Sequence, residues 1–345
     1  MDKAYLQAIS YYFPQKKLTN EDLSILHPEW NPEKIANKTG IRNRYISADE
    51  ETAVDMAEKA ANALFDEYNV DKSIVDFIIL CTQSPDYFLP TSACILQSRL
   101  SLSEKCGAFD YNLGCSGYVY GLGIAKGLVL SGSAKNVLLI TSETYSKYLH
   151  PSDKSSQTIF GDAASASLIT SQAMSEMLNA EIMDLSYKTI GSKYQSLIVP
   201  NGCSRQPMRY RSEDQFAEDG SFVRNDDYLF MDGKDIFEFS SLEVPNVVRE
   251  NMVVNNIIED DVNLFVFHQA NKYMINFVRM RMKIDQAKFV MDLEDGGNTV
   301  SSTIPIALKK QVDDGIVKSG MYVLLCGFGV GLSIASVIIH LIDND

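Results

Sequence analysis

The sequence predicts an α/β protein. Short runs of apolar and β-branched residues alternate with longer amphipathic runs over most of the 345 residues, and this alternation is typical of a sheet covered by helices. A chain of this length exceeds what one hydrophobic core usually serves, so we expect two halves that share core residues. The composition, 46% hydrophobic and 22% charged, is that of a globular protein.

The expected strands and helices follow one another along the chain. Strands are expected where short apolar runs lie between turn-forming residues, at 77–81, 106–111, 136–141, 164–170, 264–268 and 288–292, with two more near the carboxyl end. Helices are expected between them, near 51–68, 90–101, 116–131, 235–257 and 302–315. Between Asp184 and Tyr228 the pattern is lost in a stretch rich in Gly, Ser, Asp, Arg and Tyr.

The expected helix at 116–131 is apolar on most faces, which predicts a central rather than a surface position. It contains glycines at 117, 121, 123 and 127. Each costs about 1 kcal/mol of helix stability relative to alanine, which makes sense if another helix packs very closely. We therefore expect a buried helix directly after Cys115.

The segment 321–342 is apolar and long enough to span a bilayer. However, Gly327, Gly329 and Gly331 divide it into two β-branched runs. Glycines at alternate positions indicate a tight backbone loop between strands. We expect two adjacent buried strands and no membrane association.

Charge and cysteine usage exclude several classes of protein. The net charge is −14, from 31 basic and 45 acidic side chains, whereas nucleic-acid binding needs a basic surface. The six cysteines lack paired metal-site spacing, and residues 1–6 lack the apolar core of a secretion signal. We expect a cytoplasmic protein with reduced thiols and no metal site. Core positions are expected for four cysteines and an exposed loop for Cys203; the four are Cys81, Cys94, Cys106 and Cys326.

Three polar residues from distant segments indicate a covalent acyl site. Cys115 lies where an extended run ends and a helix begins; a helix amino end stabilises a thiolate, and its backbone N–H groups can hold an oxyanion. His268 follows the apolar run 262–267, so its imidazole should project from a strand end. Asn298 lies in a glycine-rich turn that can approach a ligand closely.

These features resemble the β-ketoacyl-acyl-carrier-protein synthase III family of condensing enzymes, within the thiolase-like superfamily. The resemblance covers nearly the whole chain. It rests on Cys115 and on segments in a fixed order, at 38–44, 84–86, 90–91, 160–164, 231–234, 268–271, 297–299 and 327–331. It implies a homodimer with a five-layered αβαβα fold of two similar halves, 1–175 with Cys115 and 176–345 with His268 and Asn298.

The resemblance also implies a mechanism. Cys115 takes an acyl group from a thioester, while His268 and Asn298 bind the thioester carbonyl of a malonyl-type extender. Loss of carbon dioxide gives a carbanion that attacks the acyl cysteine. Backbone groups at Cys115 and in the loop that lines the site form the oxyanion hole; that loop comprises Gly327, Phe328 and Gly329. Acyl-coenzyme A or acyl-carrier-protein thioesters are the substrates, without a cofactor.

The sequence departs from the family where acyl-coenzyme A binds. Members that load from coenzyme A commonly hold its adenine between a tryptophan and an arginine. These positions fall on Lys34 and Lys154, and the only tryptophan, Trp30, lies four residues before Lys34. Lysine cannot stack as a planar guanidinium does, so a carrier-protein thioester is the alternative primer. We expect Lys34, Lys38 and Lys154 to contact the donor.

Two further departures concern the acyl pocket. At Leu89 the family often has a phenylalanine that crosses the dimer interface and closes the partner's pocket, and a leucine could admit a different chain. The Gly-Phe-Gly-x-Gly form of 327–331 is similar to that of the chalcone-synthase-like branch, which would change the shape of the pocket. We expect the stretch 184–228 to cover the substrate entrance, with surface decoration as the alternative.

A basic line is the expected docking surface for an acidic acyl carrier protein. The run 272–283 looks helical, and at about 100° per residue Lys272, Arg279 and Lys283 fall within roughly 40° of one another. A solvated edge of an apolar helix is the competing interpretation. Tyr273 replaces an arginine that the family usually has two residues beyond the His-Gln-Ala-Asn run, so docking is expected to differ.

Three other interpretations of the site compete with condensation. A papain-like hydrolase also uses cysteine, histidine and asparagine in this order, but 114 residues precede Cys115 here. An acyltransferase that moves the acyl group from Cys115 to an alcohol or amine without decarboxylation is the serious alternative. A non-catalytic subunit is disfavoured by retention of all three polar residues. Among nearby acidic residues, Glu143 is expected to be a solvated or paired carboxylate, and Asp162 a turn residue.

Overall fold

The computed structural model describes residues 3–207 and 211–342, and within them nine strands form one mixed sheet. One half of the sheet contains, in spatial order, β1 (Tyr5–Tyr12), β7 (Ala163–Thr170), β6 (Asn136–Glu143), β4 (Phe77–Cys81) and β5 (Gly107–Tyr111). The other half contains β8 (Ala180–Thr189), β15 (Ser333–Leu341), β14 (Tyr322–Gly329) and β13 (Val262–Phe267). The halves meet where β1 pairs with β8 over only two residue pairs, Tyr5 with Glu181 and Leu6 with Ala180.

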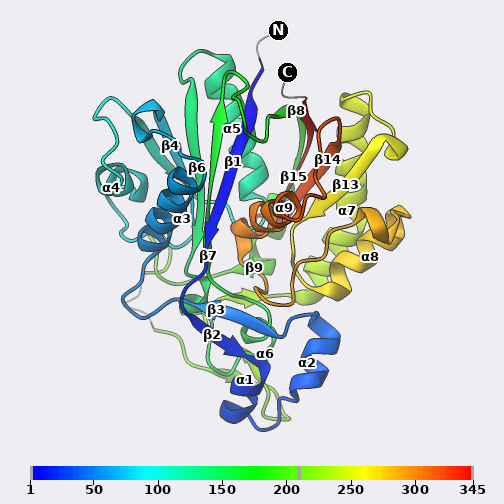
Figure 1. Cartoon of the computed structure of the whole chain (residues 1–345). Helices are drawn as coiled ribbons and strands as arrows, with labels where there is room; N and C mark the ends of the chain where they lie inside the picture. The colour runs from blue at the N-terminus through cyan, green and yellow to red at the C-terminus, as the bar shows by residue number, and fades with distance from the viewer. Residues whose placement is uncertain (1–2, 208–210, 343–345) are drawn as a thin grey trace.

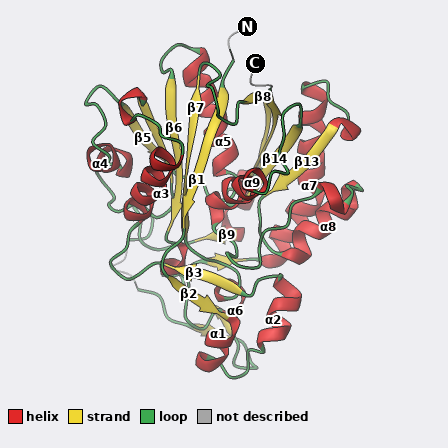
Figure 2. Cartoon of the chain, viewed as in Figure 1, coloured by secondary structure: helices red, strands yellow, loops and turns green. Residues whose placement is uncertain are grey.

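Helices cover both halves and fill the space between them (Figure 1). The central layer is α5 (Gly117–Leu130) and α9 (Thr303–Asp313), which contact strands of both halves. The outer face of the first half is covered by α3 (Ala53–Glu67) and α4 (Ser92–Arg99). On the far side α7 (Gly233–Val254) packs on the second half, and α8 (Lys272–Met282) packs on α7. Figure 2 shows the resulting alternation of helical and strand layers, which is the expected five-layered αβαβα fold.

A smaller layer closes one end of the sheet, below it in Figure 1. It contains the antiparallel pair β2 (Lys16–Thr19) and β3 (Asn43–Ile46), with α1 (Asn20–Leu26), α2 (Pro32–Thr39) and α6 (Lys154–Gln157). Short pairs β9 (Leu197–Ile198) with β12 (Phe230–Met231), and β10 (Gln215–Phe216) with β11 (Phe222–Arg224), follow in the chain. This layer and the beginnings of α7 and α8 surround the cavity described below.

The glycines of α5 permit the close packing expected of a central helix. A Cβ atom at Gly117 would lie 2.3 Å from the Cys81 Sγ, and one at Gly121 would lie 2.5 Å from the Leu139 Cδ1. Real Cβ atoms do not approach other atoms so closely, so a larger residue would force strands away from the helix. Gly127 is different, because nothing lies within 4 Å of its hypothetical Cβ. The packing comes from strands and their side chains rather than from another helix.

The carboxyl-terminal apolar segment forms the expected strand pair. β14 and β15 are antiparallel, with Tyr322 opposite His340 and Gly329 opposite Ser333. Over the described ranges 3–207 and 211–342, the structure has no helix with the length and apolarity needed to cross a membrane.

One expected strand is wrong, and two strands of the nine-stranded sheet were not expected. A 3-10 turn (Gln286–Lys288), begun by the Asp285 side chain, leads into the stretch 288–292, whose pairing with β13 is an isolated bridge between Phe265 and Phe289 rather than a strand ladder. The Asp292 N–H then bonds the Gln269 side chain instead of a strand. Strand β1 was not expected, and β8 extends regular structure into the stretch that looked irregular.

The cysteines divide differently from the expectation. Cys81 and Cys326 are buried, and Cys203 is exposed, as expected. Cys94 is exposed and is not a core residue, whereas Cys106 is partly buried and packs against the edge of the core. Cys94 lies on the outer side of the short surface helix α4, where apolar sequence neighbours do not guarantee burial.

Candidate active site

A cavity of about 690 Å³ joins the three polar residues singled out by the sequence. Cys115, His268 and Asn298 all line it, although they come from three segments that are far apart in the chain. Each is almost completely buried, so they form its inner end. Phe328 and Gly329 of β14 line the same region. These five residues converge as expected, whereas Gly327, the third residue of the expected loop, does not line the cavity and instead lies against the Cys115 backbone, where a Cβ atom would approach the Cys115 carbonyl oxygen to 2.7 Å.

Cys115 lies two residues before α5, in a space that admits no side chain opposite it. A Cβ atom at Gly329 would lie 2.8 Å from the Cys115 Sγ, which explains the glycine. Burial raises the pKa of the Cys115 thiol to about 12, and Glu143 raises it further, while hydrogen bonds from the backbone N–H groups of Val330 and Cys115 itself oppose the shift. The resting residue is thus a neutral thiol, and the helix end alone does not make it a thiolate.

His268 follows β13, where its N–H bonds the Cys326 carbonyl at 2.8 Å. The imidazole Nδ1 lies 2.7 Å from the Thr303 Oγ1, and the ring packs edge-on against Phe328 with centroids 5.6 Å apart. Burial lowers the pKa of His268 to about 3, although the Val300 carbonyl opposes the shift. The imidazole is therefore neutral at physiological pH, and its Nε2 is the nitrogen left for the cavity.

Asn298 is held by backbone bonds on both sides. Its N–H bonds the Ile159 carbonyl at 2.9 Å, and its carbonyl accepts from the Gly161 N–H at 3.0 Å. The Oδ1 accepts from the Val300 N–H at 2.9 Å, which leaves the Nδ2 as the donor for a ligand. Gly297 makes this geometry possible, since it has a φ of +66° and a Cβ there would lie 2.7 Å from the Ile159 carbonyl oxygen.

Two neutral hydrogen-bond donors and a thiol that line one cavity suit acyl chemistry in which an enolate forms. A thioester carbonyl placed between the His268 Nε2 and the Asn298 Nδ2 would receive two hydrogen bonds without a fixed negative charge nearby, and such preorganised donors stabilise a developing oxyanion. The backbone N–H groups of Val330 and Cys115 lower the pKa of the thiol, so they lie near Sγ, where a second oxyanion would form. The sequence-based expectation located that second set around Gly329, one residue from Val330.

Glu143 is closer to the chemistry than its sequence context indicated. It is fully buried rather than solvated, and burial raises its pKa to about 8. Its carboxyl accepts from the Gln83 N–H at 3.0 Å, and from the hydroxyls of Ser84 and Ser301, each at 3.2 Å. The group thereby connects the segment after β4 with the segment that follows Asn298. Only the tertiary structure reveals this, because Gln83 lies 60 residues away in the chain on one side and Ser301 158 on the other.

Asp162 is a structural residue, in agreement with the sequence. Its carboxylate accepts from the backbone N–H groups of Ser47 and Ser146, both at 2.8 Å, and is fully buried. It fixes the turn that precedes β7 and does not line the cavity.

Four exposed lysines surround the outer end of the cavity. Lys34 and Lys38 come from α2, Lys154 from α6, and Lys234 from the start of α7. The first three were expected near a thioester donor. Lys234 was missed as a site residue, although it belongs to the Met-Asp-Gly-Lys segment that marked the family resemblance.

Trp30 does not offer a free face to a ligand. Its side chain is only 4% exposed, and its ring stacks on His27 with centroids 3.9 Å apart. Lys154 lies over the ring as well, with the Nζ 5.6 Å from the centroid. The tryptophan is thus part of a small core beneath α2 and does not replace the aromatic partner of an adenine.

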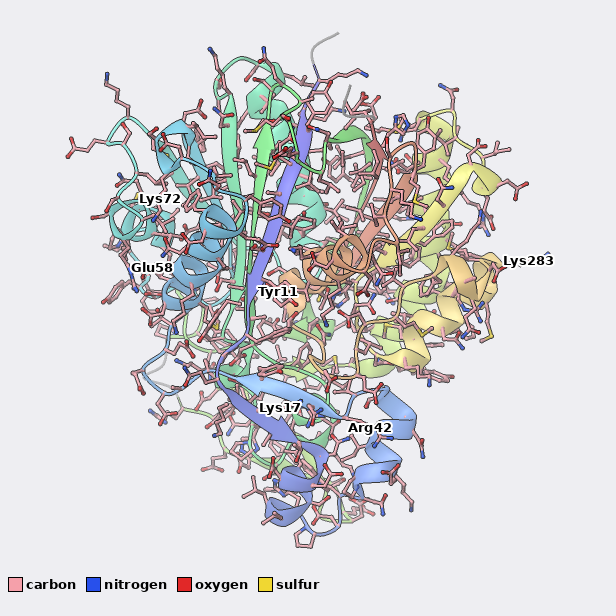
Figure 3. All side chains as sticks on the ribbon, viewed as in Figure 1. Tyr11, Lys17, Arg42, Glu58, Lys72 and Lys283 are labelled. Carbon is pink, nitrogen blue, oxygen red and sulfur yellow. The ribbon has the colours of Figure 1, made fainter. Side chains whose placement is uncertain are left out.

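The expected basic line on α8 is only partly available. Lys272 is exposed, but its side chain lies against Gly40, where a Cβ would approach to 2.6 Å. Arg279 donates to the Asn276 Oδ1 and the Ile284 carbonyl, at 2.9 and 2.8 Å, which ties it to the end of its own helix. Lys283 has left-handed backbone geometry after the last turn, and Figure 3 shows it at the outer end of α8.

The stretch 184–228 and Leu89 lie largely outside the cavity wall. Within the described part of that stretch, 184–207 and 211–228, only Leu197 lines the cavity. Its later part packs on His150, whose ring stacks on Phe222 with centroids 4.1 Å apart and whose Nε2 lies 3.3 Å from the Asp214 Oδ1. Decoration of the surface therefore describes it better than an entrance cover. Leu89 is 82% exposed and does not line the cavity of its own chain.

Comparison with known proteins decides the family. The model of 3-oxoacyl-[acyl-carrier-protein] synthase III matches residues 109–191, and that of its C-terminal part matches residues 253–341. The chain is also 34% identical over 341 residues to β-ketoacyl-[acyl-carrier-protein] synthase III of Clostridium perfringens, covering 99% of this chain and 100% of the relative. The chain belongs to the β-ketoacyl-acyl-carrier-protein synthase III family.

Solved structures agree with this membership. A crystal structure of 3-oxoacyl-(acyl-carrier-protein) synthase III superposes with a TM-score of 0.94 at 45% identity, covering 98% of this chain and 99% of the other. The 3-oxoacyl-(acyl-carrier-protein) synthase of Burkholderia xenovorans superposes with a TM-score of 0.88 at 27% identity, covering 99% and 94%. As a synthase III family member with the thiolase fold, the protein is an acyl-transferring condensing enzyme.

Proposed function

We propose that Cys115 carries the acyl group and that His268 and Asn298 stabilise the enolate of a malonyl thioester during decarboxylative condensation. The observation that carries this assignment is the convergence of the three side chains at the buried end of one cavity. The protonation of the site also bears on the assignment, because burial favours the neutral forms of both the Cys115 thiol and the His268 imidazole. The thiol must therefore pass its proton to a base before it attacks, and the neutral imidazole is a base that lines the same cavity.

Loading begins with transfer of the Cys115 thiol proton to the His268 Nε2. The thiolate attacks the donor thioester carbonyl, whose oxygen accepts hydrogen bonds from the backbone N–H groups of Cys115 and Val330. The bond between the acyl carbon and the donor sulfur then breaks. The departing thiolate takes the proton from Nε2, which leaves an acyl-cysteine and a neutral imidazole.

Condensation uses the same imidazole as a donor. The malonyl thioester carbonyl accepts from the His268 Nε2–H and the Asn298 Nδ2–H, so electron density moves onto that oxygen as the carboxylate leaves as carbon dioxide. The enolate carbon attacks the acyl carbonyl on Cys115, and the bond to sulfur breaks. The product is a β-ketoacyl thioester, and the Cys115 thiolate regains a proton from solvent.

The rim of the cavity favours a thioester carried on a phosphopantetheine arm. Lys34, Lys38, Lys154 and Lys234 place positive charge around the outer end, where a phosphate would pass. Trp30 is packed under His27 and cannot clasp an adenine. A primer on a carrier protein has no adenine and does not need a stacking site, whereas acyl-coenzyme A would bind without this stacking contact. The acidic carrier protein would meet the lysine rim and Lys272, with less help from Arg279 than the sequence indicated.

We also propose that the protein is a homodimer. β5 lies at one edge of the sheet, and in the described residues no strand pairs with its outer side. The nearby segment Tyr87–Leu89 exposes 62% to 84% of each side chain. An unpaired edge beside exposed apolar residues is a typical association surface, and there Leu89 would face the partner subunit.

Intact-protein mass spectrometry tests the assignment. The protein is incubated with acyl-coenzyme A or with an acyl-carrier primer, and malonyl-carrier protein is then added. We expect an acyl adduct that is absent in Cys115→Ala and that disappears as a β-ketoacyl product forms. The carrier-borne primer should give the adduct faster. An adduct on the Cys115→Ala protein would refute the nucleophile, and an adduct that discharges only to an alcohol or amine would refute condensation.

A further inference from the structure

The two half-reactions proposed above make opposite demands on one nitrogen. In loading, the His268 Nε2 must accept the thiol proton and therefore needs a free lone pair. In condensation, the same Nε2 must carry a hydrogen to donate to the extender carbonyl. Burial keeps the imidazole neutral by lowering its pKa, and a neutral imidazole carries one N–H only. The ring must therefore use both tautomers in each catalytic cycle.

The Thr303 hydroxyl, which faces the Nδ1 of His268, can form a hydrogen bond with either tautomer of the ring. The Thr303 Oγ1 lies 2.7 Å from the His268 Nδ1 and 3.1 Å from the Val300 carbonyl oxygen. Thr303 is only 3% exposed and is not part of the cavity lining, so it lies behind the ring, where a ligand does not reach it. A hydroxyl has one hydrogen and can also accept, so it can satisfy either state of Nδ1.

Two hydrogen-bond arrangements follow from these distances. In the first, the Thr303 hydroxyl donates to the Val300 carbonyl and accepts from Nδ1–H, which leaves the Nε2 of His268 with its lone pair. In the second, the hydroxyl rotates and donates to Nδ1, so that Nε2 carries the hydrogen. The tautomer of a histidine is set by the bond that its other nitrogen makes.

We propose that Thr303 is a positioning residue that lets His268 alternate between an acceptor Nε2 for acyl loading and a donor Nε2 for decarboxylation. The inference rests on the proposed function, since it assumes that His268 serves both steps. Thr303 itself takes no proton. The ring loses a proton from Nδ1 and gains one at Nε2, both exchanged with water, so that no proton is gained or lost by the change of tautomer.

The Val300 carbonyl determines which tautomer of His268 is expected when the Thr303 hydroxyl is removed. It lies near enough to the ring to favour a proton on it, and it has no hydrogen to donate. If the hydroxyl is removed, Nδ1 loses the group that can donate to it, and the carbonyl beside that hydroxyl, which can only accept, favours the tautomer with its hydrogen on Nδ1. Nε2 then stays an acceptor. Loading should survive, whereas the donor needed for decarboxylation is lost.

Thr303→Val and Thr303→Ser test this as a matched pair, because valine keeps the shape and serine keeps the hydroxyl. Loading is measured by mass spectrometry with an acyl thioester, and decarboxylation by release of carbon dioxide from malonyl-carrier protein. We expect Thr303→Val to lower decarboxylation roughly ten- to a hundredfold, the usual cost of one lost buried hydrogen-bond partner, while changing loading less than about threefold. Thr303→Ser should retain both rates.

Nitrogen-15 NMR of the imidazole supplies a readout that a purely structural role would not change. The chain has only four histidines, so a His268→Gln variant assigns the signal of interest. Thr303→Val should show nitrogen shifts of a ring protonated at Nδ1, and the wild-type protein shifts that lie between the two tautomers or change on acyl loading. Thr303→Ala serves the same purpose if the valine variant does not fold.

The possible outcomes distinguish a failure of the role given to Thr303 from a failure of the proposed function on which it rests. A wild-type protein that forms no adduct or releases no carbon dioxide would refute the proposed function itself. If the wild-type protein performs both steps, equal losses of both in Thr303→Val, or no loss of decarboxylation, would overturn the role of Thr303. A wild-type imidazole fixed as one tautomer before and after loading would overturn it as well.

Discussion

The backbone of Gly329 lies so close to Cys115 that a Cβ atom at position 329 would come within 2.8 Å of the thiol sulfur. This contact connects the end of β14 to the beginning of α5, two elements that belong to different halves of the molecule. It also fixes where an acyl group can sit, because the Val330 N–H that follows bonds Sγ.

Gly329→Ala should therefore block the nucleophile without unfolding the protein. The new methyl group would force the Cys115 side chain or β14 to move, and misplacing a reacting atom by about 1 Å can cost on the order of a hundredfold in rate. The measurement is the rate of acyl-adduct formation. Gly127→Ala is the control, since nothing lies within 4 Å of its hypothetical Cβ; it should load normally and gain up to about 1 kcal/mol in helix stability. Normal loading by Gly329→Ala would contradict the role given to this contact.

Asn298→Asp should impair decarboxylation more than acyl loading. A carboxylate in place of the amide would repel the developing enolate and remove a donor that is worth roughly a hundred- to a thousandfold in rate. The two half-reactions are compared in the same preparation, with acyl-adduct formation as the internal control. An equal loss of both steps would show that Asn298 is needed for the architecture of the site rather than for the enolate.

Glu143 should make stability depend on pH in an unusual direction. Burial raises its pKa from an ordinary value of 4.5 to about 8 in the folded protein. The folded state therefore holds a proton that the unfolded state has released, so this group's stabilising contribution is complete below about pH 4.5 and is lost as the pH rises toward 8. Thermal melts of wild type and Glu143→Gln over that range measure the effect.

Glu143→Gln should flatten the pH dependence because the amide does not ionise. The same substitution should make loading less sensitive to rising pH, since an ionised Glu143 raises the pKa of the Cys115 thiol. Parallel curves for the two proteins between pH 4.5 and 8 would show that the carboxyl does not titrate there.

Reversal of charge at the lysine rim should weaken binding of the thioester donor and leave the chemistry intact. Lys38→Glu combined with Lys234→Glu should raise KM for an acyl-carrier primer about tenfold, because exposed charges contribute roughly 1 kcal/mol or less each and reversal doubles the change. The value of kcat should be unaffected, and the difference should shrink at high salt. Lys318→Glu is the matched control, an exposed lysine outside the cavity lining. A fall in kcat alone, with KM unchanged, would count against the rim as a donor site.

Most of the site could be predicted because each of its polar residues is identified by the residues next to it in the sequence. Cys115 precedes an apolar helix, His268 ends an apolar strand, and Asn298 follows a pair of glycines. Each position is recognisable from a few neighbouring residues. The helices near 53–67 and 303–313 were predictable for the same reason, since amphipathic runs report the face that a helix buries.

The errors share a different cause. The expected strand at 288–292 failed because the Asp285 side chain begins a turn and Gln269, from another segment, takes the Asp292 N–H. Cys94 was misplaced, and of the two alternatives for the stretch 184–228 the surface position fits its described part better; neither could be decided earlier, because burial depends on which elements come to lie beside a residue. The helix spacing of Lys272, Arg279 and Lys283 was sound in principle, but Arg279 is tied to Ile284 and Lys283 lies beyond the last turn.

The sequence by itself determined the α/β class, the family and the three polar residues of the site, since short-range patterns encode periodicity and the residue types that the chemistry requires. Only the tertiary structure decided the protonation of Cys115, His268 and Glu143 and the placement of Thr303 behind the imidazole. Those properties come from burial and from partners far away in the chain. Desolvation and hydrogen bonding depend on where every neighbouring atom lies, and a linear pattern of residues does not specify that.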